Sequence, residues 1–432
     1  MSVFDLGVTL QGATAVQVGA SVKGQAGLSG GVAGDPARAG ARGHVAFALP
    51  GLGAGGAERV VSIIANAMVK RGWRVTVLAF DEPASRSYYE YDPAVEIVSL
   101  GYAPARRPAI ERTLRTVTRI HVLRRALERL HPDVVLSFLT RTNVVALLAT
   151  IGMDIPVVVS ERNNPEVQNF GRIWSVLRSK LYPSAFGLVT MTADAMDFFP
   201  EKMRRRGWVI PNPVMPPAVQ VPAQPSATKT VVAVGRLVQQ KGFDLLLRAF
   251  ARIAASHPDW NLVIWGEGEE RAALEQEIVR LGLEDRASLP GITAQPGGWA
   301  SGADLFVMSS RYEGWGNVLL EALAAGIPSI TFDCPWGPRE MVKDGVNGLL
   351  VRAEEVPALA AALSKMMDDP ALRERLATEA RRSAERFTPG PIVTAWEQTA
   401  EAAIAGKRLR QNESQDLGLV GAAGIEPATP PV

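Results

Sequence analysis

The chain has 432 residues, a hydrophobic fraction of 47%, a charged fraction of 21% and a formal net charge of +2. This length predicts more than one domain, and the small net charge excludes a global electrostatic field that would favour nucleic acid as a partner. The single cysteine, Cys334, excludes an intramolecular disulfide and a cysteine-based zinc site, and it fits a reducing cytoplasm.

The N-terminal half alternates short apolar strands with helices. Before it, residues 1–43 are rich in Gly, Ala, Val and Ser without a sustained period, which predicts a flexible extension. Residues 44–211 form the first predicted domain, because short apolar strands that alternate with helices are typical of a parallel sheet covered on both faces. We expect strands at His44–Pro50, Arg74–Phe80, Asp133–Phe138 and Val157–Ser160, and helices at Glu58–Arg71, Ile110–Leu130 and Asn143–Thr150.

A proline-rich linker at 212–228 separates this half from a second alternating domain at 229–388. We expect strands at Thr230–Val234, Asn261–Trp265, Ala287–Leu289, Asp304–Met308 and Ile327–Phe332, and helices at Gly242–Ala255, Glu269–Leu281, Asn317–Ala325, Val356–Met367 and Pro370–Arg386. Residues 389–406 are predicted to be a helix that packs back on the N-terminal domain, and 407–432 a disordered tail. The fold class is therefore α/β, with two facing doubly wound, Rossmann-like domains and a ligand site in the cleft at the carboxyl ends of the strands.

No apolar run reaches the roughly 18 residues that a transmembrane helix needs. The N-terminus also lacks the basic start and the apolar core of a signal peptide. We therefore expect a cytoplasmic protein.

A glycine cluster, Gly51-Leu52-Gly53-Ala54-Gly55-Gly56, follows the first strand and matches the G-x-G-x-x-G spacing, with Asp81 after the second strand. Three interpretations are open: a dinucleotide site of an NAD-dependent dehydrogenase, a flexible turn, and a mobile loop that closes over a ligand bound mainly by the other domain. We favour the third.

Two cations, Arg236 and Lys241, lie in the loop after the first strand of the second domain. Arginine can bind a diphosphate in bidentate fashion and lysine as a point charge, although an isolated pair of this kind is more often solvated. The next strand ends in Gly266-Glu267-Gly268. Three such strand ends at one edge of a sheet, counting the stretch described next, favour a ligand site.

The stretch Ser309–Gly326 predicts a strand end, a glycine-containing turn and a helix. Glu313 lies in the turn and Glu321 in the helix, on either side of backbone N–H groups beside Gly314 and Gly316 that form a natural seat for phosphate. Acids at helix starts are common. Together with the neighbouring strand ends, however, they predict a nucleotide-sugar site.

These segments resemble the retaining glycosyltransferases of family 4, which have the GT-B fold. The resemblance implies catalytic roles for Arg236 and Lys241, which would hold the donor diphosphate, and for Glu313, which would contact the donor sugar. It also implies that Glu321 holds the ribose hydroxyls, and that the remaining donor-binding positions are Gly55 and Gly56, which would close over the donor, together with Gly266 and the backbone near Gly316, Asn317 and Val318. The nucleotide would most often be UDP, as part of a substrate and not of a cofactor.

The chain has no Asp-x-Asp motif. This fits a mechanism without a metal ion, in which cations and helix N-termini stabilise the leaving diphosphate. The resemblance further implies that the leaving phosphate oxygen takes the acceptor proton on the same face of the sugar. A non-catalytic protein that binds a nucleotide sugar is the alternative.

One position departs from the family pattern. Many relatives have a histidine after the strand Asp133–Phe138, where this chain has Thr140 and Asn143; either could contact the sugar instead. The segments Ser160–Pro165 and Phe332–Glu340 resemble a subgroup that extends polyprenyl-linked or exopolysaccharide glycans. The implied acceptor is a glycan or a polyprenyl-diphosphate-linked glycan. Cys334, in the second segment, is expected to be a small buried hydrophobic residue.

The helix Ile110–Leu130 combines an apolar side with a run of arginines, namely Arg112, Arg115, Arg119, Arg124, Arg125 and Arg129. A basic amphipathic helix can lie on an anionic membrane, here the inner face of the cytoplasmic membrane, or it can be an ordinary covering helix with a solvated basic side. Trp174, Arg178 and Lys180 form a second candidate for the same contact.

Overall fold

The computed structural model describes residues 42–82, 85–101, 109–164, 166, 171–215 and 228–422, without the side chains of 109–114 and 409–422. The predicted extension 1–43 lies outside this description except for Arg42 and Gly43. Most of the predicted linker, residues 216–227, and the last part of the tail, 423–432, also lie outside it.

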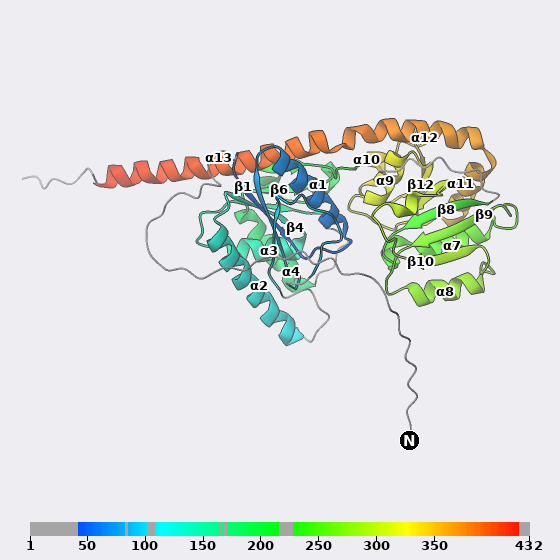
Figure 1. Cartoon of the computed structure of the whole chain (residues 1–432), viewed down its shortest axis with the longest axis horizontal. Coiled ribbons are helices and arrows are strands. Elements are labelled where there is room, and N and C mark those ends of the chain that lie inside the picture. Colours follow the sequence, from blue (N-terminus) through cyan, green and yellow to red (C-terminus); the bar gives the residue numbers. More distant parts are fainter. Residues whose placement is uncertain are drawn as a thin grey trace, which may run out of the picture. The chain divides into compact units, whose positions relative to one another are not determined.

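The N-terminal half contains a seven-stranded sheet in the order β3-β2-β1-β4-β5-β6-β7, and its described strand pairs are parallel (Figure 1). The strands are β1 (His44–Leu49), β2 (Arg74–Ala79), β3 (Glu96–Ser99), β4 (Val134–Phe138), β5 (Val157–Ser160), β6 (Gly187–Thr190) and β7 (Gly207–Val209). The connecting helices are α1 (Gly56–Lys70), α2 (Ala109–Leu130), α3 (Thr140–Ala149), α4 (Arg172–Leu181), η2 (Tyr182–Ser184), α5 (Ala193–Asp197) and α6 (Glu201–Arg204).

The C-terminal half contains a six-stranded sheet in the order β10-β9-β8-β11-β12-β13, again with parallel pairs. Its strands are β8 (Lys229–Val234), β9 (Trp260–Trp265), β10 (Ala287–Gly291), β11 (Leu305–Met308), β12 (Ser329–Asp333) and β13 (Leu349–Arg352). Its helices are η3 (Gln239–Lys241), α7 (Phe243–Ala251), α8 (Arg271–Arg280), η4 (Gly298–Ala300), α9 (Asn317–Ala325), α10 (Pro338–Met341), α11 (Val356–Asp368), α12 (Pro370–Ala384) and η5 (Glu385–Phe387).

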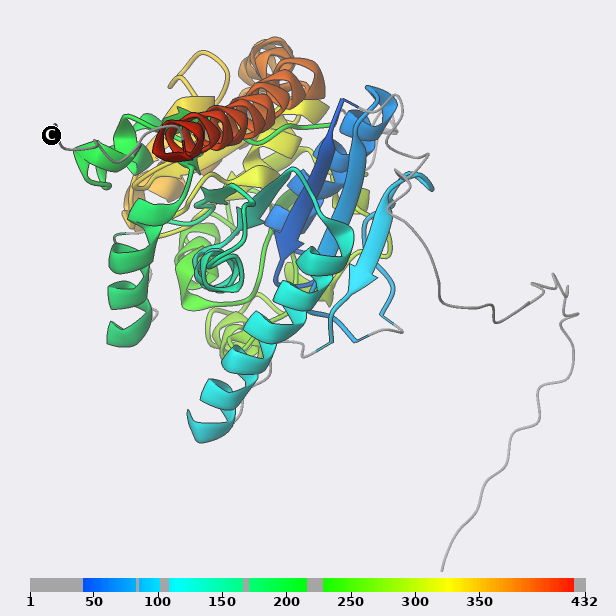
Figure 2. The same cartoon turned by 90° about the vertical axis from the view of Figure 1, so that its left-hand side faces the viewer.

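Both sheets are covered on two faces, as the near-continuous apolar strands predict (Figure 2). In β1 every residue is buried. Val45 and Phe47 belong to the core that includes α1, whereas Ala46 and Ala48 belong to the core that includes α2 and α3. This alternation places one helical layer on each side of the sheet, and the prediction of two doubly wound α/β domains is confirmed.

The last described helix, α13 (Pro389–Ala422), returns the chain to the N-terminal half (Figure 1). Its side chains Ile392, Val393 and Trp396 lie in the same core as β1 and β4. The prediction of a disordered tail from residue 407 differs from the structure, because α13 continues through Ala422. Lys407 to Gln411 are mostly strong helix formers, and a helix already nucleated by a packed segment extends at little cost.

Candidate functional site

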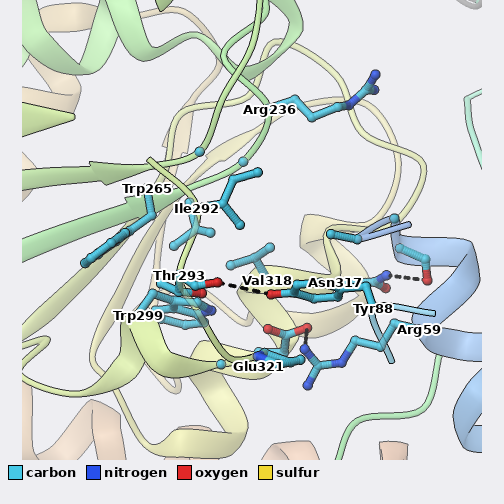
Figure 3. A pocket seen from close by; sticks show the side chains of 18 of the residues that line it. Arg59, Tyr88, Arg236, Trp265, Ile292, Thr293, Trp299, Asn317, Val318 and Glu321 are labelled. Carbon is cyan, nitrogen blue, oxygen red and sulfur yellow. Dashed lines mark hydrogen bonds and ion pairs between the residues drawn. The ribbon is translucent and has the colours of Figure 1, made fainter. Parts of the chain in front are cut away.

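A pocket of about 430 Å³ lies at the carboxyl ends of β8 and β9 (Figure 3). The C-terminal half supplies most of its lining, from the strand ends, the loop after β10 and the start of α9, and the N-terminal half adds the glycine turn, α1 and two tyrosines. The predicted residues that line it are Gly55, Gly56, Arg236, Gly266, Asn317, Val318 and Glu321.

The floor of the pocket includes the start of α9. Gly316 precedes this helix with φ +97°, a left-handed conformation that suits glycine, and no side chain caps the first turn. The first backbone N–H groups of α9, at Asn317 and Val318, therefore lie beside the pocket with the positive end of the helix dipole. Gly316 itself does not line the pocket; it sets the direction in which the helix begins.

Lys241 and Glu313 lie behind this pocket instead of lining it. The Lys241 ammonium is 2.5 Å from Glu313 Oε1, and the Ser310 hydroxyl donates to the same oxygen at 2.6 Å. The Lys241 stem packs against Gly235, which does line the pocket; a Cβ at Gly235 would be 3.2 Å from Lys241 Cε. The two predicted catalytic groups are thus paired with each other, which compensates the cost of burying each charge alone.

Glu321 projects into the pocket and forms an ion pair with Arg59 of α1, with 2.9 Å between Arg59 Nη1 and Glu321 Oε1 (Figure 3). Burial raises the pKa of Glu321, while Arg59 and a hydrogen bond from Trp299 act in the opposite direction. Arg59 was not among the predicted site residues. Its position three residues after Gly56, in the first turn of a helix that begins at the glycine cluster, was the available signal.

Arg236 is exposed at the rim of the pocket, near Glu58. The pKa of Glu58 is raised to about 7, mainly by burial and to a smaller extent by Asp81, whereas a hydrogen bond from its own backbone N–H and the charge of Arg236 act in the opposite direction. Asp81 itself accepts a hydrogen bond from the Leu52 N–H. The carboxylate that a dehydrogenase would use for a ribose is therefore committed to the backbone of the glycine turn, which disfavours the dinucleotide interpretation.

Aromatic and aliphatic side chains form one wall of the pocket, at the end distant from Arg236 (Figure 3). They are Trp265, Ile292 and Trp299, and Tyr88 lies opposite with its hydroxyl 3.4 Å from the Thr293 carbonyl. A flat apolar wall with a few polar groups suits a planar ring such as a nucleobase. Sequence reasoning missed this wall, although Trp265 directly precedes the predicted Gly266.

Thr140 and Asn143 do not line this pocket, and their side chains are bonded within the N-terminal half. Thr140 Oγ1 donates to Glu161 Oε2 at 2.9 Å, and Asn143 Nδ2 donates to the Tyr182 hydroxyl at 2.9 Å. Tyr182 in turn donates to Glu161. All four are buried, and burial raises the pKa of Glu161. These hydrogen bonds fix the segment that follows β5 against α3 and η2.

Cys334 is buried beside Glu313, and burial together with that carboxylate raises the pKa of the thiol to about 12. A thiol with such a pKa is protonated at neutral pH and is a poor nucleophile. This agrees with the prediction of a small buried hydrophobic residue.

The residues predicted to contact a membrane lie on two helices, α2 and α4. In α2, Arg124 donates to the carbonyls of Ala149 and Ile151, and Arg119 lies over the Phe80 ring at 5.1 Å, so these two arginines partly serve packing. Arg112 lies where side chains are not described. The helix α4 has no buried side chain at all. Within the described residues, no helix has both the length and the apolar character needed to cross a bilayer.

Two family models match this chain. Residues 55–213 match "Glycosyl transferase 4-like domain", and residues 217–383 match "Glycosyl transferases group 1". The first range contains β2 to β7 but begins after β1, and the second contains every strand of the C-terminal sheet.

Curated relatives and solved structures agree with these matches. The lipopolysaccharide core biosynthesis glycosyltransferase LpsD of Rhizobium meliloti is 33% identical, over 52% of this chain and 68% of its own length. An undecaprenol-diphosphate-linked glycan alpha-1,4-N-acetyl-D-galactosaminyltransferase of Campylobacter jejuni is 27% identical, over 82% of this chain and 96% of its own. The structure of sucrose-phosphate synthase from Thermosynechococcus elongatus superposes with a TM-score of 0.73 at 20% identity, covering 84% of this chain and 100% of that one. HepE from Anabaena, in complex with UDP and glucose, superposes with 0.68 at 21% identity, covering 83% and 99%.

Proposed function

Because the chain belongs to the family 4 type of group 1 glycosyltransferases, with the GT-B fold, we propose that it transfers a hexose or N-acetylhexosamine from a UDP-sugar to a glycan or lipid-linked acceptor. The observation that carries this proposal is the pocket at the carboxyl ends of β8 and β9. It combines an aromatic wall, a mostly buried carboxylate, a helix N-terminus and an arginine in one cavity of about 430 Å³.

These features follow the order of the parts of a nucleotide sugar. The aromatic wall at Trp265 and Trp299 would receive the base, and Glu321 would accept hydrogen bonds from the ribose hydroxyls. The diphosphate would lie between Arg236 and the N–H groups at the start of α9. Its negative charge would also draw Lys241 from its present partner Glu313, which frees that carboxylate for the hydroxyls of the sugar.

The reaction that we propose retains the configuration of the sugar and uses no metal ion. The bond between the anomeric carbon and the diphosphate oxygen breaks, a bond from the acceptor oxygen to that carbon forms on the same face, and the acceptor proton passes to the leaving phosphate oxygen. Arg236, Lys241 and the α9 N-terminus would stabilise the charge that develops on the diphosphate.

The acceptor would approach from the N-terminal half, and it would be a polyprenyl-diphosphate-linked or exopolysaccharide glycan. The Campylobacter relative supports this class, since its name describes an undecaprenol-diphosphate-linked acceptor. The surface of α4 supports a peripheral position on an anionic membrane. Ile173 is 74% exposed and Val176 49%, with the exposed cations Arg172 and Lys180 on the same short helix.

The test is a turnover assay with a panel of UDP-sugars and lipid-linked glycans, in which UDP release and product are both measured. Replacement of Arg236 and Lys241 together by alanine should abolish turnover. The matched control replaces Arg280 and Lys365, an exposed arginine and lysine of the same domain, and should keep full activity. UDP binding without transfer to any acceptor would instead favour a non-catalytic nucleotide-sugar-binding protein. Near-normal activity of the double variant would rule out the diphosphate role.

A further inference from the structure

A chain of side-chain hydrogen bonds connects the two halves beneath the pocket. Arg162 Nη2 donates to Asn212 Oδ1 at 2.6 Å, and Asn212 Nδ2 donates to Asn317 Oδ1 at 2.5 Å. Asn317 Nδ2 then donates to the Gly56 carbonyl at 3.2 Å (Figure 3). The four residues follow β5, follow β7, begin α9 and begin α1, so this relay joins segments that are far apart in the sequence.

The direction of the relay is fixed by its two ends. A guanidinium can only donate and a carbonyl can only accept, so each amide between them must turn its oxygen toward Arg162 and its nitrogen toward Gly56. Either amide, if flipped, would place two donors or two acceptors face to face. The relay therefore has one satisfied arrangement, and it holds the Asn317 side chain in a single orientation.

The first member of the relay is anchored in the N-terminal core. The Arg162 guanidinium lies over the rings of Phe138 at 5.2 Å and Trp396 at 5.7 Å, and the residue is only 7% exposed. Its Nε and Nη1 find no hydrogen-bond acceptor among the described residues. The bond to Asn212 is therefore the polar contact through which this buried charge acts on its surroundings, and charge-assisted bonds are the stronger kind.

The second member lies in the segment that leaves the first sheet. Asn212 is 4% exposed and stands between Pro211 and Pro213, whose rings restrict the backbone on both sides. Asn212 itself does not line the pocket.

At the other end the two halves approach at backbone distance. A Cβ at Gly56 would be 2.6 Å from Asn317 Nδ2, and a Cβ at Gly314 would be 2.7 Å from the Asn163 Cα. Glycine at both positions allows the glycine turn and the Glu313 loop to close on the opposite half. Asn317 lines the pocket at this contact, so its side chain ties the start of α9 to the turn that would cover the donor.

We propose that Arg162 and Asn212 are positioning residues, which through Asn317 hold the Gly55–Gly56 turn against the start of α9 and so align the donor with the acceptor half. The turnover part of this inference rests on the proposed function. The geometric part, that Asn212 controls the order of the glycine turn, does not.

The sharpest variant is Asn212→Asp, which changes one NH₂ to an oxygen without changing the shape. The remaining acceptor still receives the bond from Arg162, now as an ion pair, whereas the other oxygen of the new carboxylate faces Asn317 Oδ1. If the Asn317 amide flips to donate to this carboxylate, its own oxygen faces the Gly56 carbonyl. In this variant Asn317 can therefore donate either to the carboxylate at position 212 or to the Gly56 carbonyl, but not to both.

Three measurements test the inference, with Asn261→Asp as the matched control. Asn261 likewise accepts a bond from an arginine, Arg286 Nε at 3.2 Å, but lies on β9 outside the pocket lining. For Asn212→Asp we expect faster hydrogen exchange in the glycine turn, at least about tenfold lower turnover at saturating UDP-sugar, and a UDP dissociation constant within about threefold of the unaltered protein. The control should match the unaltered protein in all three.

Each outcome decides for or against the relay. Unchanged exchange in the turn, or a loss of turnover smaller than about tenfold, would overturn the inference, as would a loss of UDP affinity as large as the loss of turnover. If the unaltered protein turns over no UDP-sugar, the proposed function fails, but the exchange measurement still decides the relay. If Asn212→Asp does not fold, Arg162→Lys replaces it: it keeps the charge, loses the guanidinium geometry, and should show the same split between turnover and UDP binding.

Discussion

At the scale of single residues, the proposed contact between Glu321 and the ribose leads to a first prediction, on nucleotide binding. Glu321→Ala should weaken UDP binding by about 1.5–3 kcal/mol, because a hydrogen bond to a charged group is lost. The quenching of Trp265 and Trp299, which line the pocket, provides the measurement. The same change at the exposed Glu284 is the control. Since the variant also frees Arg59, Glu321→Ala should be compared with the double variant that removes Arg59 too. If both variants bind UDP as tightly as the unaltered protein, Glu321 does not hold the ribose.

The raised pKa of Glu58 leads to a second prediction, which concerns the pH dependence of the free energy of unfolding. Its pKa of about 7 in the folded protein lies above the ordinary value of 4.5, so the folded state holds a proton that the unfolded state releases. The stabilisation is complete below pH 4.5 and is lost as the pH rises through 7, up to about 3 kcal/mol. Glu58→Gln should therefore flatten the fall in unfolding free energy between about pH 5 and about pH 8. Denaturant titrations at both values measure it, and parallel curves for the two proteins would contradict the assignment.

Residues on strand ends of the C-terminal half could be predicted from the sequence, because glycines and charges after apolar strands mark the same edge of a parallel sheet. Arg236, Gly266 and Glu321 all line the pocket. Arg59 and Tyr88 were not predicted, since they reach the pocket only through the packing of the two halves; for Arg59 the sequence signal is its position three residues after Gly56. Spacing also could not show that Lys241 and Glu313 are paired behind the pocket, because they are 72 residues apart in the chain.

At the scale of secondary structure, the long periodic helices and the buried strands were predictable, and the short edge elements were not. The missed strands β3 and β7 have exposed or half-buried residues, so they lack the apolar run that identifies a central strand. The short strands β6 and β13 and the helix α4 were also missed. In α4 apolar side chains lie on both faces, since Trp174, Leu177 and Leu181 pack half-buried on the core while Ile173 and Val176 are exposed, and this blurs the helical pattern in the sequence.

The exposed face of α4 leads to a prediction on membrane binding. Ile173→Ser with Val176→Ser should reduce the fraction of protein that sediments with anionic liposomes, because each aliphatic side chain loses about 1.5–3 kcal/mol of burial in the interface at most. Val279→Ser is the control, since Val279 is 62% exposed on α8 of the other half. Equal loss for the control and the α4 variant would point to general surface hydrophobicity, and binding that persists in both would remove α4 from the interface.

At the scale of the whole molecule, the C-terminal helix belongs structurally to the N-terminal half. Glu397 of α13 accepts hydrogen bonds from Arg42 at 2.8 Å, Arg71 at 2.7 Å and Trp73 at 2.9 Å. Since the intervening chain forms the entire C-terminal sheet, the first half completes its core only after the second has been synthesised. The sequence shows a helix here, but its partner is set by tertiary packing.

The packing of α13 on the N-terminal sheet leads to a prediction for Trp396, which lies in this contact. Its ring is fully buried and stacks on Phe138 of β4 with 5.2 Å between centroids. Trp396→Ala should therefore destabilise the N-terminal half by about 3–5 kcal/mol, as the loss of a large buried aromatic side chain does. Hydrogen exchange should accelerate in β1 and β4 and stay unchanged in β8 and β11. The mirror control is Trp260→Ala, because Trp260 is equally buried in the core of the other sheet and should accelerate β8 and β9 instead. Should Trp396→Ala loosen both sheets to the same degree, the two halves unfold as one unit, and α13 stabilises the entire two-sheet assembly instead of the first half alone.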